Sequence, residues 1–150
     1  MSAFEIVEVE PMTALVRTAT CPPTDLGPVV GRLFGEITAG NPDADCIAPP
    51  CVFYTTWTPE ACSIEAAIPV EDSVVAASGT EKRFFPAKRA ARMVHVGPYE
   101  GLAAAWSRFW SAIQADDVDA AGACWDAYVT DPGSEPDASK WVTELYIPLR

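Results

Sequence analysis

The residue best placed for chemistry is Glu144, an acid inside an otherwise apolar segment, Trp141–Leu149. Side chains alternate in direction along a strand, so Glu144 shares a face with Tyr146. The segment is apolar on both faces apart from Glu144 and Thr143, which indicates a strand covered on both sides. Burying an unpaired carboxylate costs several kcal/mol. Two explanations stay open: a counter-charge or acid/base group for a ligand, or a carboxylate bonded internally to a tyrosine or arginine.

A second carboxylate, Asp126, lies in the predicted strand 124–130, where Tyr128 two residues later faces the same way. Glu65, in the predicted strand 62–70, stands at a place comparable to that of Glu144 and is expected on a solvent face.

Aromatic side chains could supply surfaces for a flat ligand. Tyr54, Tyr128 and Tyr146 each combine an apolar ring with a hydroxyl, and a cation over such a ring gains roughly 0.5–2 kcal/mol. Trp106 stands near the start of the predicted helix 99–114, and we expect it to form an aromatic wall.

The spacing of apolar residues predicts two sets of elements in the order strand, helix, strand, strand. The first set has a helix over 25–39, with Thr24 as its N-cap, and the second a helix over 99–114. Pro86 indicates an interruption or an edge position within the segment 84–96. The predicted strands are 4–10 and 12–20, divided by Pro11, then 51–57, 62–70, 84–96, 124–130 and 141–149.

Comparing the two sets supports duplication. Pro98 follows Pro22 by 76 positions, and Ile113 follows Ile37 by the same 76. The closing strands share Glu-x-x-Ile-Pro, at an offset of 79 positions. The sequence therefore predicts an α+β fold of two tandem βαββ repeats.

The balance of acidic and basic residues limits the classes of partner that we expect the protein to bind. Among 150 residues, 21 are acidic and 10 basic, a net charge of −11 with histidine neutral. Such a charge repels phosphate backbones and anionic lipids, so we expect no direct nucleic-acid and no membrane partner. No apolar run approaches the ~20 residues that span a bilayer. The first ten residues hold no basic side chain, and the five cysteines read as reduced thiols, so we expect a cytoplasmic protein.

The remaining ionisable residues have simpler explanations. The cysteine spacings match no zinc signature and there is one histidine, so we expect neither metal nor cofactor. That histidine, His95, is expected to stabilise the turn at Gly97-Pro98 by a hydrogen bond. Lys88, Arg89 and Arg92 form a basic cluster that we expect on the solvated side of a strand.

Three segments together resemble the GyrI-like effector-binding domains: His95–Tyr99, Trp125–Pro132 and Thr143–Leu149. The resemblance covers essentially the whole chain. It implies one domain over 1–150, with repeats of about 4–70 and 83–149 related by a pseudo-twofold axis. A groove between the repeats would bind bulky, often cationic aromatic compounds through stacked aromatics and buried carboxylates. In that arrangement Asp126 and Glu144 approach each other, which would raise one carboxyl pKa.

We therefore expect a standalone protein that binds bulky aromatic, cationic small molecules. Glu144 would supply charge and Asp126 secondary charge, and the stacking surfaces would come from Tyr146, Tyr128, Tyr54 and Trp106. The alternative is a hydrolase of reactive electrophilic natural products in the same groove. There Glu144 would steer or activate water, and the Tyr146 hydroxyl would polarise the leaving group.

A third hypothesis is a gyrase inhibitor that mimics DNA with an acidic surface. We rank it last because the acidic residues are dispersed along the chain. The sequence does not predict an oligomeric state.

Overall fold

The computed structural model describes residues 4–150, which form antiparallel strands and α-helices grouped in two units. One unit comprises Glu10–Ala87. The other joins the residues up to Val9 to Lys88–Arg150. Each unit is a mixed α/β arrangement of four antiparallel strands and one α-helix.

The unit of Glu10–Ala87 has the sheet order β5-β2-β4-β3. Helix α1 contacts β2 and β4, and its buried residues are Leu33 and Ile37. The elements are β2 Met12–Cys21, α1 Leu26–Gly40, β3 Cys51–Trp57, β4 Cys62–Val70 and β5 Glu81–Phe85.

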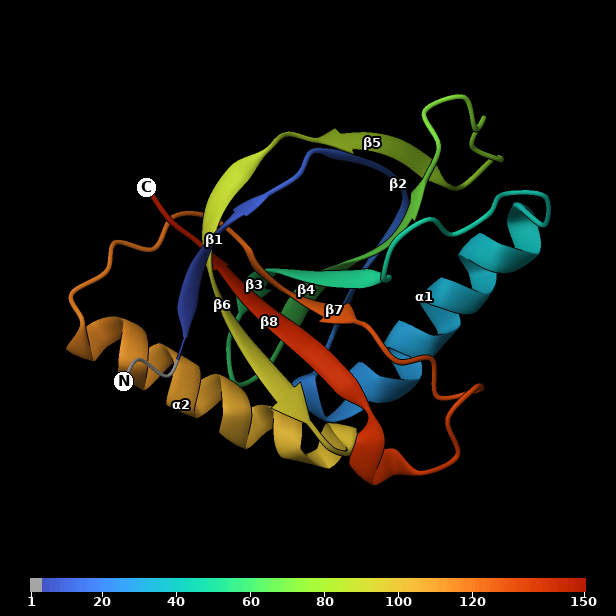
Figure 1. Cartoon of the computed structure of the whole chain (residues 1–150). Helices are drawn as coiled ribbons and strands as arrows, with labels where there is room; N and C mark the ends of the chain where they lie inside the picture. The colour runs from blue at the N-terminus through green and yellow to red at the C-terminus, as the bar shows by residue number, and fades with distance from the viewer. Residues whose placement is uncertain (1–3) are drawn as a thin grey trace. The chain divides into compact units, whose positions relative to one another are not determined.

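The unit that contains the C-terminus has the sheet order β1-β6-β8-β7, again antiparallel. Figure 1 shows its helix, α2, running along β6 and β8. The elements are β1 Glu5–Val9, β6 Lys88–Val96, α2 Leu102–Ala115, β7 Cys124–Tyr128 and β8 Val142–Pro148.

The core of this second unit lies between α2 and one face of its sheet. Helical spacing places Ala105, Phe109 and Ile113 on one stripe of α2, and all three are buried. They form a cluster with the buried strand residues Leu145 and Ile147, which alternate with Glu144 and Tyr146 along β8. The sheet thus has a covered face toward α2 and an opposite, outer face, which carries Arg92, Val94, Glu144 and Tyr146. The outer face is only partly exposed, because Ala90, Trp125 and Ala127 on it are buried.

The turn between β6 and α2 is fixed by His95. Its Nε2 lies 3.0 Å from the carbonyl oxygen of Pro98, which confirms the hydrogen bond expected from the sequence. Gly97 has a φ of 133°, in the region that favours glycine. A Cβ at Gly101 would lie 2.7 Å from Cε1 of His95, so the imidazole packs where only glycine leaves room.

Two local predictions need correction. Thr24 is not an N-cap: it lies in a 3-10 turn, Pro23–Asp25, and no side chain of the described residues caps α1. The predicted strand 84–96 is two strands, because Pro86 has no N–H for the ladder and separates β5 from β6.

The edge strands pair outside their order along the chain. Strand β1 precedes β2 in sequence, yet it pairs with β6. Strand β5 precedes β6, yet it pairs with β2. The connection after each edge strand contains a proline, Pro11 after β1 and Pro86 after β5. Within residues 4–150, no helix has the length and apolar character needed to cross a bilayer.

Candidate functional site

Glu144 lies on the outer face of β8, where its cross-strand neighbours are Val94 of β6 and Ala127 of β7. Its Oε1 accepts a hydrogen bond of 2.9 Å from the Tyr146 hydroxyl. Its Oε2 is 3.3 Å from a guanidinium nitrogen of Arg92. The side chain is 23% exposed. Of the two explanations that the sequence left open, the internal tyrosine and arginine partners are both present, and the carboxylate still reaches the surface.

Arg92 bridges two carboxylates. Glu5 of edge strand β1 is its cross-strand neighbour, and a second guanidinium nitrogen is bonded to Oε1 of Glu5. The hydrogen bond to Glu5 is the main reason that the pKa of Arg92 is raised, so the guanidinium stays charged. One positive charge faces two negative ones, so the Glu5–Arg92–Glu144 triad carries a net negative charge. The sequence led us to expect Arg92 on the solvated side of a strand. Instead, its side chain is 30% exposed and ion-paired with Glu5 and Glu144.

A pair of stacked aromatic rings lies beside Glu144 on the outer face. Trp125 lies opposite Tyr146 across the β7–β8 ladder, and their rings stack with centroids 4.8 Å apart and planes 8° apart. Nζ of Lys88 lies 5.0 Å from the centre of the Trp125 ring. Burial lowers the pKa of Lys88. Neither Trp125 nor Lys88 was among the predicted site residues, although strand alternation places Trp125 on the face opposite to Asp126.

Apolar side chains on the same face are accessible. Val94, the cross-strand neighbour of Glu144, is 50% exposed, and Val96 is 61% exposed. Val142, on the same face of β8, is partly buried. A carboxylate beside exposed apolar surface is an arrangement that suits an amphipathic or cationic aromatic ligand.

Tyr146 is held as a hydrogen-bond donor. Burial, followed by its hydrogen bond to Glu144 and the charge of that carboxylate, raises the pKa of Tyr146 to about 12, although Arg92 partly opposes this rise. The phenol is therefore protonated near neutral pH and can donate a hydrogen bond, but it cannot act as a base there.

The prediction that Asp126 approaches Glu144 is wrong. In the β7–β8 register Asp126 lies opposite Leu145, and Ala127 lies opposite Glu144, so the two carboxylates are on opposite faces of the sheet. Asp126 is fully buried on the covered face. Its carboxylate accepts hydrogen bonds from the Trp106 indole at 2.9 Å and from the Tyr128 hydroxyl at 3.2 Å.

The other predicted aromatic residues are distributed among several places. Trp106 stacks on core residue Phe109, with centroids 5.8 Å apart. Tyr128 meets Tyr99 edge to face, with centroids 5.6 Å apart. Tyr54 belongs to the unit of Glu10–Ala87, where it packs edge to face on Trp57. Of the six predicted site residues, the outer face around Arg92 therefore carries Glu144 and Tyr146.

The unit of Glu10–Ala87 has a comparable charged triad. Arg83 binds both Glu65 and Glu81. Glu65 is 18% exposed, so its carboxylate is partly accessible and is held by an ion pair with Arg83. Phe53 and Phe85 stack with centroids 4.7 Å apart, and the guanidinium of Arg83 lies 5.8 Å from the Phe85 ring centre.

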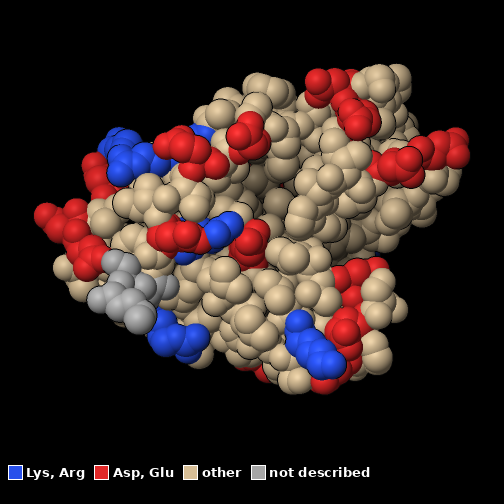
Figure 2. All heavy atoms as spheres, viewed as in Figure 1, with Lys and Arg blue, Asp and Glu red and all other residues tan. Residues whose placement is uncertain are grey.

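Two other surface features give no stronger candidate. On the face drawn in Figure 2, acidic groups are spread over the surface and several basic groups lie beside them, which does not resemble one DNA-like stripe.

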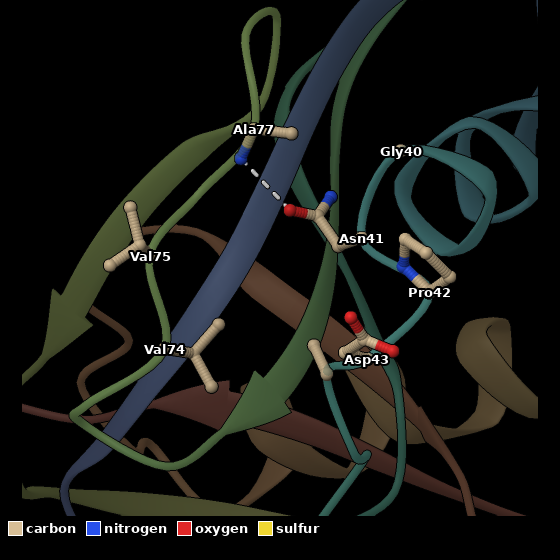
Figure 3. A pocket seen from close by; sticks show the side chains of 8 residues that line it. Gly40, Asn41, Pro42, Asp43, Val74, Val75 and Ala77 are labelled. Atoms are coloured by element: carbon tan, nitrogen blue, oxygen red, sulfur yellow. Dashed lines mark hydrogen bonds between the residues drawn. The ribbon is translucent and has the colours of Figure 1, made fainter.

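A pocket of about 320 Å³ at the end of α1 is bordered by Asp43, Val74 and Val75. There Oδ1 of Asn41 accepts the Ala77 N–H at 2.9 Å (Figure 3). None of the six predicted site residues borders this pocket.

Metal chemistry receives no support from side-chain grouping. Among residues 4–150, no three histidine, cysteine or acidic side chains are arranged to hold a metal ion. The five cysteines are free thiols.

Structural comparison shows which proteins share this fold. The chain matches EcmrR in its DNA complex, with a TM-score of 0.85 and 16% identity, over 98% of this chain and 57% of that one. It thus spans little more than half of that EcmrR chain. The EcmrR C-terminal domain matches with a TM-score of 0.81 and 18% identity, over 98% and 96% of the two chains.

Two further solved structures are similar. SAV2435 bound to tetraphenylphosphonium matches with a TM-score of 0.76 and 10% identity, over 98% of this chain and 93% of that one. A hydrolase from Listeria innocua matches with a TM-score of 0.65 and 16% identity, over 98% and 91%. At these identities the likeness establishes a common fold.

No curated protein sequence matches the chain. The family model of the GyrI-like small molecule binding domain matches residues 2–150. That match spans essentially the whole sequence, and the protein therefore belongs to the GyrI-like small molecule binding domain family.

Proposed function

We propose that this GyrI-like domain binds bulky aromatic cations on the outer face of the sheet β1-β6-β8-β7. The observation that carries the proposal is the position of Glu144, a partly exposed carboxylate beside exposed Val94 and the Tyr146 ring. The carboxylate supplies the charge. The valine and the aromatic ring supply apolar contact, and the Trp125 ring stacks on the Tyr146 ring.

Charge on a larger scale favours the same class of ligand. The net charge of −11 attracts cations toward the surface, and the Glu5–Arg92–Glu144 triad holds two carboxylates to one guanidinium. SAV2435, which shares the fold, is bound to tetraphenylphosphonium, a lipophilic aromatic cation. That compound is therefore the first probe to use.

The test compares tetraphenylphosphonium with the uncharged triphenylmethanol by calorimetric titration of the full chain. Glu144→Gln keeps the shape and removes the charge. A charge-assisted contact contributes roughly 1–3 kcal/mol, so we expect tetraphenylphosphonium binding to weaken about 5- to 150-fold, with triphenylmethanol nearly unaffected. Glu65→Gln, which removes a charge from the other triad, is the matched control and should change neither. Equal losses for both compounds with Glu144→Gln would refute the charge role.

The alternative function is hydrolysis of reactive electrophilic natural products at the same place. It is favoured by the 2.9 Å hydrogen bond from Tyr146 to Glu144 and by the Listeria innocua hydrolase that shares the fold. Glu144 would steer or activate water, and the protonated Tyr146 would polarise the leaving group. Mass analysis of candidate electrophiles after incubation tests it. Turnover should disappear with Glu144→Gln while binding of the electrophile persists.

We also propose that the two units are tandem βαββ repeats of one domain over 1–150. Support comes from corresponding pairings at a constant offset of 76 positions. Glu5 pairs with Arg92, and Glu81, 76 positions after Glu5, pairs with Val16, 76 positions before Arg92. The edge strands thus occupy equivalent places in the two sheets.

A further inference from the structure

Glu144 already has a cation beside it, and that cation belongs to the protein. Arg92 approaches Oε2 of Glu144 from the neighbouring strand β6. Any ligand cation that uses Glu144 must share this oxygen with the guanidinium or take its place. The affinity of the site for a cation therefore depends on how firmly Arg92 holds Glu144.

The two contacts of Arg92 differ in strength. Its nitrogen is 3.3 Å from Glu144, longer than the 2.7–2.9 Å typical of a charge-assisted hydrogen bond. Another nitrogen donates a hydrogen bond to Glu5, and this hydrogen bond is the first cause of the raised pKa of Arg92. Arg92 is therefore anchored on Glu5 and held only loosely by Glu144. If Glu144 turns to a ligand, Arg92 keeps a counter-ion.

We propose that Arg92 is a specificity-determining residue, an internal counter-ion that competes with ligand cations for Glu144. This inference rests on the binding function proposed above. The competition disfavours small, strongly hydrated cations, because they offer Glu144 no more than Arg92 does. A bulky aromatic cation adds apolar contact with exposed Val94 to the charge that Arg92 already offers Glu144 and Tyr146, and so it can displace the guanidinium from Glu144.

Glu5 then acts as a positioning residue. It draws Arg92 toward edge strand β1 and so leaves Glu144 only partly neutralised. Removing the charge of Glu5 leaves Arg92 with Glu144 as its one carboxylate partner among the contacts described for it. The expected effect of Glu5→Gln on a bound cation is therefore opposite to that of Arg92→Gln.

The experiment measures the dissociation constant of tetraphenylphosphonium for the full chain and its variants, with folding checked by thermal unfolding. Arg92→Gln should strengthen binding by about 2- to 5-fold, the range expected when a partly exposed ion pair is removed. Arg92→Lys keeps a positive charge but cannot bridge Glu5 and Glu144 with two nitrogens, so it should strengthen binding less than Arg92→Gln does. Arg83→Gln removes the arginine of the other triad and should have no effect.

Glu5→Gln should weaken tetraphenylphosphonium binding by about 2- to 5-fold. The same change made together with Arg92→Gln separates two causes. If Glu5 acts through Arg92, its loss has little effect once Arg92 is absent. If Glu5 acts only through its own charge, the loss is the same in both backgrounds, and the positioning role is overturned.

The outcomes distinguish this inference from the proposed function. If the original chain binds tetraphenylphosphonium and Arg92→Gln leaves that affinity unchanged or weaker, the competition is overturned while the binding function stands. If the original chain does not bind and Arg92→Gln does, the competition is supported and the proposed binding of this cation by the original chain is wrong. If neither binds, the proposed function is wrong and this inference with it.

Discussion

The indole Nε1 of Trp106 donates a hydrogen bond to Oδ1 of Asp126 across 2.9 Å and so ties helix α2 to strand β7. Asp126 is fully buried, and its other carboxylate oxygen accepts the Tyr128 hydroxyl. A buried carboxylate depends on such donors, because water cannot replace them. This relationship indicates that Trp106 and Asp126 stabilise the fold.

Trp106→Phe should therefore lower the free energy of unfolding. The phenyl ring keeps most of the packing on Phe109 but removes the donor, and the loss of a hydrogen bond to a charged group is worth about 1.5–3 kcal/mol. Urea unfolding measures it. Trp110→Phe is the matched control on the same helix, where the side chain is exposed, and should cost less than about 0.5 kcal/mol. Similar losses at both positions would contradict the role of Asp126.

The phenol of Tyr146 makes stability depend on alkaline pH. Its pKa rises to about 12 in the fold, from the ordinary tyrosine value of 10.0. A raised pKa means that the fold favours the neutral phenol, so this contribution is complete below pH 10 and is lost as the pH rises through 12. We expect Tyr146→Phe to lose less stability between pH 10 and 12 than the original chain does. Thermal unfolding across this range checks the prediction, with Tyr54→Phe as the control for removing a phenol.

Thiol reactivity should separate Cys124 from Cys46. Burial, with the charge of Asp126 as the second cause, raises the pKa of Cys124 to about 11. At pH 8 only about 0.1% of such a thiol is thiolate, the form that reacts. Cys46 is exposed, although its pKa is also raised by burial. Alkylation followed by mass spectrometry should label Cys46 first. Labelling of Cys124 should accelerate as the pH approaches 11, and fast labelling of Cys124 at pH 8 would contradict the prediction.

Local sequence patterns predicted much of the fold. The alternation in Cys51–Trp57 and Cys62–Val70 predicted both strands with the bounds that the structure confirms. The helix stripe through Phe109 and Ile113 is likewise the buried one. These features depend on neighbours within one element, and such neighbours are visible in a sequence.

The candidate site depends on register between strands, which a single sequence does not specify. A shift of one residue between β7 and β8 decides whether Asp126 or Ala127 lies beside Glu144. The Arg92–Glu144 pair joins residues 52 positions apart, and the Arg92–Glu5 pair joins residues 87 positions apart. Alternation places Trp125 on the face opposite to Asp126, but no local pattern identifies Arg92 as the neighbour of Glu144.

The pairing of edge strand β1 with β6, which lies far away along the chain, has a consequence for synthesis on the ribosome. All strands of the Glu10–Ala87 sheet are translated in one stretch, whereas β1 emerges first and must wait for β6, its only partner in the described ladders. During that interval the nascent chain carries a strand with unpaired backbone groups, which invites association with other polypeptides. Glu5 and Glu8 place negative charges along β1. Repulsion between such charges on different chains disfavours this association until β6 has been translated and can pair with β1.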